Sequence, residues 1–281
     1  MAITNFIPTV WSENLYQALD KQYIAVAHCN RDFEGDIKEK GNVVKICGVG
    51  NVVVSDYTKN TNMKNPDTLT DNVRDLVIDQ AKYFNFQLDD VDRTQANPHL
   101  MDLAMKNAAD ALANAADKYI FKQYSNAGYC TTYDQEEGDS IINCLISART
   151  HLIEKNVYDP NDIVIEVSPA IGELILMEKM DRFKDSTDAF ETGCIGSIGG
   201  CKIYVSNNIT VIDQGHYQEH MCLVRTKRSI AFAEQLSEIE AYRPELRFAD
   251  AVKGLHLYGA KVVYPEEMVC LVCRKYMESD E

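Results

Sequence analysis

The chain has 281 residues, 46% of them hydrophobic, which is enough to bury a sizeable core in one large or two medium domains. It carries 43 Asp and Glu residues against 28 Lys and Arg, and the formal net charge of -15 disfavours binding to phosphate backbones or an anionic membrane. Sequence-specific DNA binding is therefore not expected. Because no window has the apolar length of a transmembrane helix and the start lacks the pattern of a signal peptide, we expect a soluble protein made in the cytosol.

The cysteines give no sign of a disulfide framework or a metal site. All nine are scattered along the chain, and the single C-x-x-C motif joins Cys270 and Cys273 within an apolar run that begins at Met268. This run predicts a buried strand, and residues three apart on a strand point to opposite faces. The pair is poorly placed to share a metal ion, so we predict reduced thiols and no cofactor.

The first part of the chain combines an apolar extended segment with a short helix. The large side chains of the extended segment are Ile3, Phe6, Ile7, Val10 and Trp11. Ser12 can cap the helix, whose apolar side chains recur at helical spacing at Leu15, Ala18, Leu19, Tyr23 and Val26. Two interpretations stay open: this arm docks on its own domain, or a neighbouring subunit covers its apolar groups.

A period-two pattern follows and indicates long antiparallel strands. It runs through residues 41–46, 50–54 and 73–88, and in the last of these Phe84 and Phe86 share one face. Residues 55–72 are polar and almost free of aliphatic side chains, so they cannot form a core. The pattern predicts long strands that join at a hydrophilic tip and project from the body.

A long helix and then a mixture of helices and strands complete the chain. Asn97 and Pro98 predict a helix start, and the helix is expected to end near Ala127, roughly 45 Å away at about 1.5 Å per residue. The later pattern predicts helices at residues 140–155 and 168–183 and strands at residues 162–167, 202–205 and within 222–274. This order predicts an α+β body with a mixed sheet.

Three motifs invite a chemical interpretation, and each has a simpler structural one. The glycines of 193–200 precede a strand instead of the Lys-Ser/Thr and helix of a phosphate loop, which favours a structural turn. The carboxylates of Asp89, Asp90 and Asp92 suit a divalent cation, but an acidic turn explains them equally well. His216 and His220 do not form the metalloprotease motif. No catalytic residue is predicted from these motifs.

Several short motifs occur along the chain in a recognisable order. They are Asn5-Phe-Ile-Pro8, Trp11-Ser12, Asn30-Arg-Asp-Phe-Glu-Gly35, Ser55-Asp-Tyr57, Asp79-Gln-Ala-Lys-Tyr-Phe-Asn-Phe86, Asp89-Asp-Val-Asp92, Ile195-Gly-Ser-Ile-Gly-Gly200 and Tyr204-Val-Ser-Asn-Asn208. Together with the order of arm, projection, long helix and α+β body, they resemble tailed-bacteriophage major capsid (coat) proteins of the Hong Kong 97-like fold family. The resemblance covers nearly the whole chain.

The resemblance implies a division of the chain and a set of contact residues. The implied parts are an N-terminal arm (1–31), an extended β-hairpin loop (32–92), a peripheral domain with a spine helix (93–138), an axial domain (139–225) and return strands of both domains (226–281). The candidate residues for contacts between subunits are Phe6, Ile7, Trp11, Leu15, Tyr57, Lys59, Asn60, Lys64, Asp185, Ile195 and Ile198.

The function implied is that of a structural subunit. It would assemble with itself into the pentamers and hexamers of an icosahedral capsid in the host bacterial cytoplasm, enclose double-stranded DNA without sequence-specific binding, and remain in the virion. A portal is an expected partner, and so is a separate scaffolding protein, because no scaffolding segment precedes the arm. A decoration protein on the outside stays open, and no crosslinking residue is predicted.

Two alternatives stay open from the sequence. One is an encapsulin-type compartment shell with the same fold and a protein cargo. The other is a cytosolic enzyme with a cation or nucleotide site at residues 89–92 or 193–200, which predicts a compact oligomer with a pocket.

Overall fold

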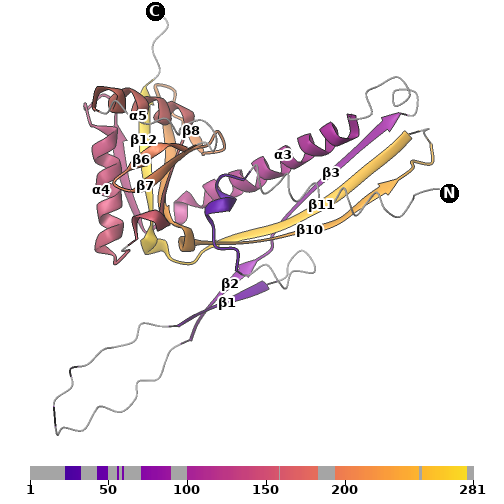
Figure 1. Ribbon diagram of the computed structural model, residues 1–281, viewed down its shortest axis with the longest axis horizontal. Coiled ribbons are helices and arrows are strands. Elements are labelled where there is room, and N and C mark those ends of the chain that lie inside the picture. The colour runs from indigo at the N-terminus through magenta and orange to yellow at the C-terminus, as the bar shows by residue number, and fades with distance from the viewer. Residues whose placement is uncertain are drawn as a thin grey trace, which may run out of the picture.

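The computed structural model describes residues 23–32, 43–49, 56, 59, 71–89, 100–157, 159–182, 194–246 and 249–276. The helices among them are α3 (Leu100–Phe121), α4 (Ile141–Glu154) and α5 (Pro169–Arg182), with short 3₁₀ turns η1 (Val26–His28), η3 (Lys122–Asn126), η4 (Pro160–Asp162), η5 (Lys227–Ser229) and η6 (Pro265–Glu267). The strands are β1 (Val43–Val49), β2 (Asp71–Val77), β3 (Gln80–Asp89), β4 (Tyr129–Asp134), β5 (Ile163–Val167), β6 (Cys194–Ile198), β7 (Cys201–Val205), β8 (Val211–Asp213), β9 (Tyr217–Thr226), β10 (Ile230–Tyr242), β11 (Ala249–Val262) and β12 (Met268–Tyr276). These strands form two sheets and a two-stranded ribbon (Figure 1).

The larger sheet has seven strands in the order β4-β12-β9-β5-β7-β6, with β8 paired to β9. Strand β12 runs parallel to β4 and antiparallel to β9, so the sheet is mixed, as predicted. Helices α4 and α5 cover one face, where Leu145, Leu152 and Ile171 belong to the same buried cluster as Ile165 of β5. Ser168 caps α5, because its hydroxyl accepts a hydrogen bond from the Ile171 N–H.

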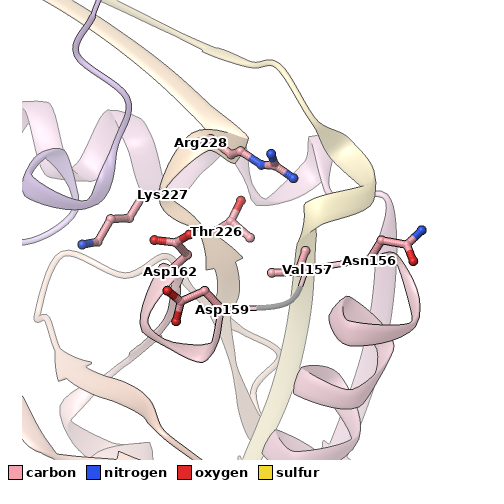
Figure 2. A pocket seen from close by; sticks show the side chains of 7 residues that line it. All are labelled: Asn156, Val157, Asp159, Asp162, Thr226, Lys227 and Arg228. Atoms are coloured by element: carbon pink, nitrogen blue, oxygen red, sulfur yellow. The ribbon is translucent and has the colours of Figure 1, made fainter. Parts of the chain in front are cut away.

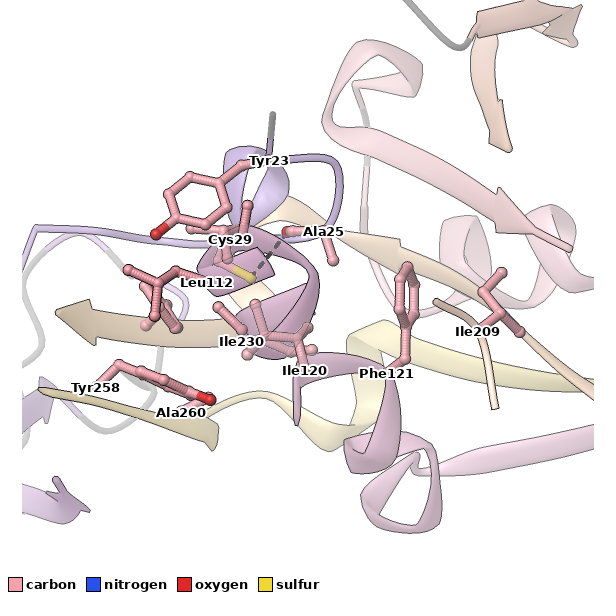
Figure 3. Close-up of a cluster of buried hydrophobic side chains, with 14 of the residues drawn as sticks. Tyr23, Ala25, Cys29, Leu112, Ile120, Phe121, Ile209, Ile230, Tyr258 and Ala260 are labelled. Carbon is pink, nitrogen blue, oxygen red and sulfur yellow. Dashed lines mark hydrogen bonds between the residues drawn. The ribbon is translucent and has the colours of Figure 1, made fainter. Parts of the chain in front are cut away.

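The smaller sheet has the order β10-β11-β3, and α3 lies along one of its faces (Figure 1). The apolar stripe of α3 packs on Phe232, Val252 and Tyr258 of this sheet, and the same cluster contains Leu223 and Met268 of the larger sheet. Figure 3 shows this shared cluster around α3. The long helix is therefore the element on which both sheets converge.

The ribbon consists of β1 and β2 and points away from both sheets (Figure 1). Its register pairs Val43 with Val77 and Val49 with Asp71. At its inner end, side chains of the ribbon pack on the small sheet, on the face opposite α3. Because a two-stranded ribbon is marginally stable by itself in water, this inner contact holds the strands in place.

Three predicted elements differ from those observed. The long helix predicted to end near Ala127 ends at Phe121, and the chain continues as the 3₁₀ turn η3. The strand predicted over 73–88 is two strands, because the chain leaves the ribbon after Val77 and joins the small sheet at Gln80. The helical spacing predicted to reach Val26 does not hold at its end, since residues 23–25 are not helical and a 3₁₀ turn begins at Val26. The N–H groups of Ile24, Ala25 and Val26 are all bound to the Asp117 carboxylate of α3 instead of to carbonyls of a helix. The earlier part of that helix and the strand predicted at 50–54 lie outside the described residues.

Candidate functional site

The inner end of the ribbon is built from apolar side chains of four strands and the chain next to them. We call this cluster the ribbon root; its buried members are Ile46, Leu76, Ile78, Ala231, Ala233, Leu257 and Val263. At this same inner end, on the side away from the root, the paired residues Val43 and Val77 are 49% and 46% exposed. The root thus fixes the ribbon to the subunit, while beyond the root strands β1 and β2 point away from both sheets (Figure 1).

After β2 the backbone of Val77 and Ile78 passes over strand β11 at Gly259, next to the ribbon root. A methyl group added at Gly259 would lie 2.3 Å from the Val77 carbonyl oxygen, so only glycine allows this crossing. Tyr119 of α3 donates a hydrogen bond of 2.8 Å to Asp79, and Arg74 reaches the Val262 carbonyl at 3.4 Å. Burial and the Asp79 carboxylate raise the pKa of Tyr119, so its hydroxyl stays protonated and can donate.

A shallow cleft of about 390 Å³ lies beside this crossing. Its lining comes from the ribbon, the end of α3 and the turn after β11, and consists of Asp75, Val77, Asp79, Tyr119, Gln123, Asn126, Ala260, Lys261, Val262 and Pro265. Both carboxylates and a lysine line it, so the cleft is polar and open. The cleft therefore lies at the inner end of the ribbon, where the ribbon leaves the body.

The predicted contact residues fall partly within the described structure. Lys59 is exposed, Ile195 is half-buried against the core of the large sheet, and Ile198 is 7% exposed and belongs to that core. The Ile198 side chain therefore packs inside its own subunit. The other candidates lie outside the described residues, namely Phe6, Ile7, Trp11, Leu15, Tyr57, Asn60, Lys64 and Asp185.

The glycine motif forms a hairpin turn. Strands β6 and β7 pair with Ile198 opposite Cys201, and Gly199 and Gly200 between them have φ of 56° and 88°. Positive φ at both central residues is the type I′ geometry that glycine permits and that suits a two-residue hairpin. The structural interpretation of this motif is confirmed, because the two glycines form a turn that leads into strand β7.

The remaining motifs also have structural roles or lie outside the description. Cys270 and Cys273 belong to the clusters on opposite faces of the large sheet, as predicted for a strand. Asp90 and Asp92 lie outside the described residues. In the part of the chain that is described, no group of three His, Cys, Asp or Glu side chains could hold a metal ion.

A second cleft, of about 340 Å³, lies beside the turn η5 at one end of β9 (Figure 2). It is lined by Asn156, Val157, Asp159, Asp162, Thr226, Lys227 and Arg228. Arg228 is already paired with Glu267 and lies over the ring of Tyr264. The lining carries charges of both signs, and Val157 is its single apolar residue.

His220 is a buried titratable side chain of the large sheet. It lies on β9 opposite Cys273, is 4% exposed, and neither ring nitrogen has a hydrogen-bond partner among the described residues. Burial, together with the nearby charge of Lys275, lowers the pKa of His220. The native state therefore keeps this imidazole neutral where an unfolded chain would protonate it.

Replacing His220 with leucine is expected to stabilise the subunit, more so in acid. At pH 8 the gain is about 1 kcal/mol, because a buried polar group without partners is removed. Below the unfolded-state pKa of about 6.5, the wild type loses stability as the unfolded chain binds a proton that the native state refuses, and the variant lacks this loss. Thermal melts from pH 8 to pH 5 measure the difference, with exposed His216→Leu as control. A gap between variant and wild type that stays constant with pH would contradict this assignment.

Among the described residues, no helix is long and apolar enough to cross a membrane. No protein-family model and no curated protein matches the chain. Solved structures do. A chain of Mycobacterium phage Che8 is 29% identical, with a TM-score of 0.66 over 96% of this chain and 98% of that chain. The capsid structure of the cyanophage P-SCSP1u aligns with a TM-score of 0.64 and 14% identity over 88% of this chain and 86% of that one.

A third similar structure is a virus-like particle from Pyrococcus furiosus, with a TM-score of 0.54 and 12% identity over 92% of this chain and 96% of that chain. At such low identity the second and third likenesses show the fold alone. The Che8 likeness adds sequence identity over almost the whole length of both chains. Taken with the mixed sheet, the long helix and the projecting ribbon, it supports the identification of this chain as a phage major capsid protein, a structural subunit of a shell.

Proposed function

We propose that this capsid protein has the Hong Kong 97-like fold and assembles with copies of itself into the pentamers and hexamers of a closed shell around double-stranded DNA. The observation that carries the proposal is the ribbon, which leaves the body and is attached to it at its inner end, chiefly through the root. Apolar groups such as Val43 and Val77 remain half exposed on it. A neighbouring subunit is the natural partner for such a surface in a repeating shell.

The proposed division of the subunit follows from the two sheets. The seven-stranded sheet with α4 and α5 is the axial domain, mostly within residues 139–225. The small sheet with α3 is the peripheral domain, and residues 226–281 return to both, since β10 and β11 join the small sheet and β12 the large one. Residues 1–31 are the N-terminal arm, and residues 32–92 contain the extended loop, whose last strand pairs with β11.

A phage shell is favoured over an encapsulin-type compartment. The observation that favours the phage shell is the identity of 29% with the Che8 chain over almost the whole length of both chains. The net charge of -15 suits a container that must release its DNA, because a strongly cationic wall would retain it by counterion release. Assembly in the bacterial cytoplasm with a separate scaffolding protein and a portal belongs to this proposal.

Shortening the ribbon is expected to abolish closed particles without unfolding the subunit. Residues 50–70 are replaced by Asn-Gly, because Val49 and Asp71 are direct partners in the register and a two-residue turn can join them. Circular dichroism should show a wild-type fold, and negative-stain electron microscopy should show particles for the wild type alone. As a control, residues 50–70 are replaced by a Gly/Ser segment of the same length. This control keeps the length of the connection and removes only its side chains. Normal particles from the shortened chain would remove the ribbon from the proposal.

A further inference from the structure

The segment Tyr23–Asp32 lies where the two sheets and α3 meet. Its apolar residues Tyr23, Ala25 and Cys29 belong to the cluster around α3 (Figure 3). Asn30 pairs with β10 as an isolated parallel bridge, with hydrogen bonds of 2.9 Å from its N–H to the Ile230 carbonyl and from the Phe232 N–H to its own carbonyl. A short segment with little regular structure is therefore bound to several elements at once.

The large sheet holds this segment through a buried ion pair. Arg225 of β9 and Glu166 of β5 are both 0% exposed and are joined by two hydrogen bonds of 2.9 and 3.0 Å. The same guanidinium donates to the carbonyls of His28, at 2.6 Å, and Ala25, at 3.0 Å. Burial alone would raise the pKa of Glu166, but the charge of Arg225 holds it below its usual value, so the pair stays ionised.

Helix α3 holds the opposite side of the segment. The Asp117 carboxylate, 1% exposed, accepts hydrogen bonds from the N–H groups of Ile24, Ala25 and Val26 at 3.0 to 3.1 Å. Burial raises the pKa of Asp117 to about 6, while these backbone donors oppose that rise. In residues 24–28, backbone carbonyls thus bind the Arg225 cation of the large sheet, and backbone N–H groups bind the Asp117 carboxylate of α3.

The small sheet supplies a third attachment, centred on Glu234 of β10. Its carboxylate accepts hydrogen bonds from the Tyr23 hydroxyl at 2.5 Å and from Arg31 at 2.6 Å, and His256 Nε2 of β11 lies 2.9 Å away. Tyr23 and Arg31 stand near the two ends of the segment. Both ends are therefore fixed to the small sheet, while the middle is fixed to the large sheet and to α3.

We propose that Tyr23–Asp32 is a clasp that fixes the seven-stranded sheet to α3 and the small sheet, with Arg225 as its central bond. The clasp also sets the points at which residues 1–22 enter the subunit and residues 33–42 leave it toward the ribbon. Its role in assembly rests on the proposed function, because those two segments are the ones proposed to meet neighbouring subunits. Its role within one subunit does not depend on assembly.

Hydrogen exchange of the full-length wild-type subunit is the first test. The N–H groups of Ile24, Ala25 and Val26 should belong to the slowest class, alongside those of β9, because they open only when the attachments to α3 and the large sheet are broken. Exchange of this segment within seconds, as for exposed backbone, would overturn the clasp. This measurement needs no variant, so a misfolded mutant cannot obscure it.

Two variants then test the central bond. Arg225→Met should speed exchange in residues 23–32 at least tenfold. In the double variant Glu166→Met/Arg225→Met no charge is left buried and unpaired, so the sheet can remain folded while the donors to Ala25 and His28 are lost. Arg228→Met is the matched control: Arg228 stands three residues away and pairs with Glu267 without touching the segment. A folded double variant with wild-type exchange in residues 23–32 would refute the assignment to Arg225.

Electron microscopy separates the clasp from the proposed function. A folded double variant with fast exchange in residues 23–32 should form fewer closed particles than the wild type by at least tenfold. Wild-type yields from that variant would overturn the role of the clasp in assembly. A wild-type chain that shows the slow exchange but forms no particles, alone or with a scaffolding protein, would instead contradict the proposed function and leave the clasp intact.

Discussion

Replacing Gly259 with alanine is expected to destabilise the subunit by about 3 kcal/mol and to displace the ribbon from the body. The new methyl group would stand 2.3 Å from the Val77 carbonyl oxygen and 3.1 Å from the Ile78 Cα, and both are backbone atoms that cannot rotate aside. Relief requires the chain to move off β11, which opens the ribbon root at Leu76 and Ile78. The apolar contacts of the root are then lost together.

Urea denaturation and particle yield measure this effect, and Gly254→Ala on the same strand is the control. There the added methyl would meet the Phe84 ring at 2.5 Å, which is a side chain that can turn away. The control should therefore cost less stability and leave the ribbon in place. Equal losses in the two variants would show that the crossing at Gly259 is no tighter than an ordinary side-chain contact.

The sequence predicted best those elements whose signals are local. The caps and apolar spacing of α4 and α5 lie within the helices themselves, and the Gly199-Gly200 turn follows from two residues that tolerate positive φ. The order of helices and strands along the chain followed from these local signals, and this order predicted the mixed sheet. For the same reason the opposite faces of Cys270 and Cys273 could be predicted without any tertiary contact.

The break between β2 and β3 could not be predicted in this way. The alternation of side chains continues from Val73 to Leu88, although the partner strand changes from β1 to β11. That change is decided by the ribbon root, where Ile78 packs on residues of β10 and β11 that lie more than 150 positions away in the chain. Gly259, a glycine inside an apolar strand, was the available signal of a close backbone approach.

The clasp was missed because its parts are distant in sequence. Glu166 stands alone in the strand Ile163–Val167, whose residues are all buried, and a charged residue in such a strand requires a buried partner. That signal was available and pointed to an ion pair, but the partner Arg225 lies 59 residues later. The helical spacing that was extended to Val26 reflects real burial of Tyr23 and Val26, but Asp117 provides the partners of the backbone there.

The core around α3 joins the two sheets, and Phe121 is the side chain that tests this best. It is fully buried at the end of α3, and Figure 3 shows it at the same end of the cluster as Ile209, which follows β7 of the large sheet. The other end of the cluster in this view contains Tyr258 and Ala260 of the small sheet. Because all these side chains belong to one continuous cluster, the cavity left by removal of the ring is expected to affect the packing of both sheets.

Replacing Phe121 with alanine is accordingly expected to cost about 3–5 kcal/mol of the free energy of unfolding, whereas Phe121→Leu, which keeps most of the volume, should cost less than about 1.5 kcal/mol. Urea denaturation followed by circular dichroism gives both values. Hydrogen exchange shows where the loss acts: amides of β9 in the large sheet and of β11 in the small sheet should both exchange faster in the alanine variant. Faster exchange in one sheet alone would mean that the cluster does not couple the two, and that each sheet derives its stability from its own contacts.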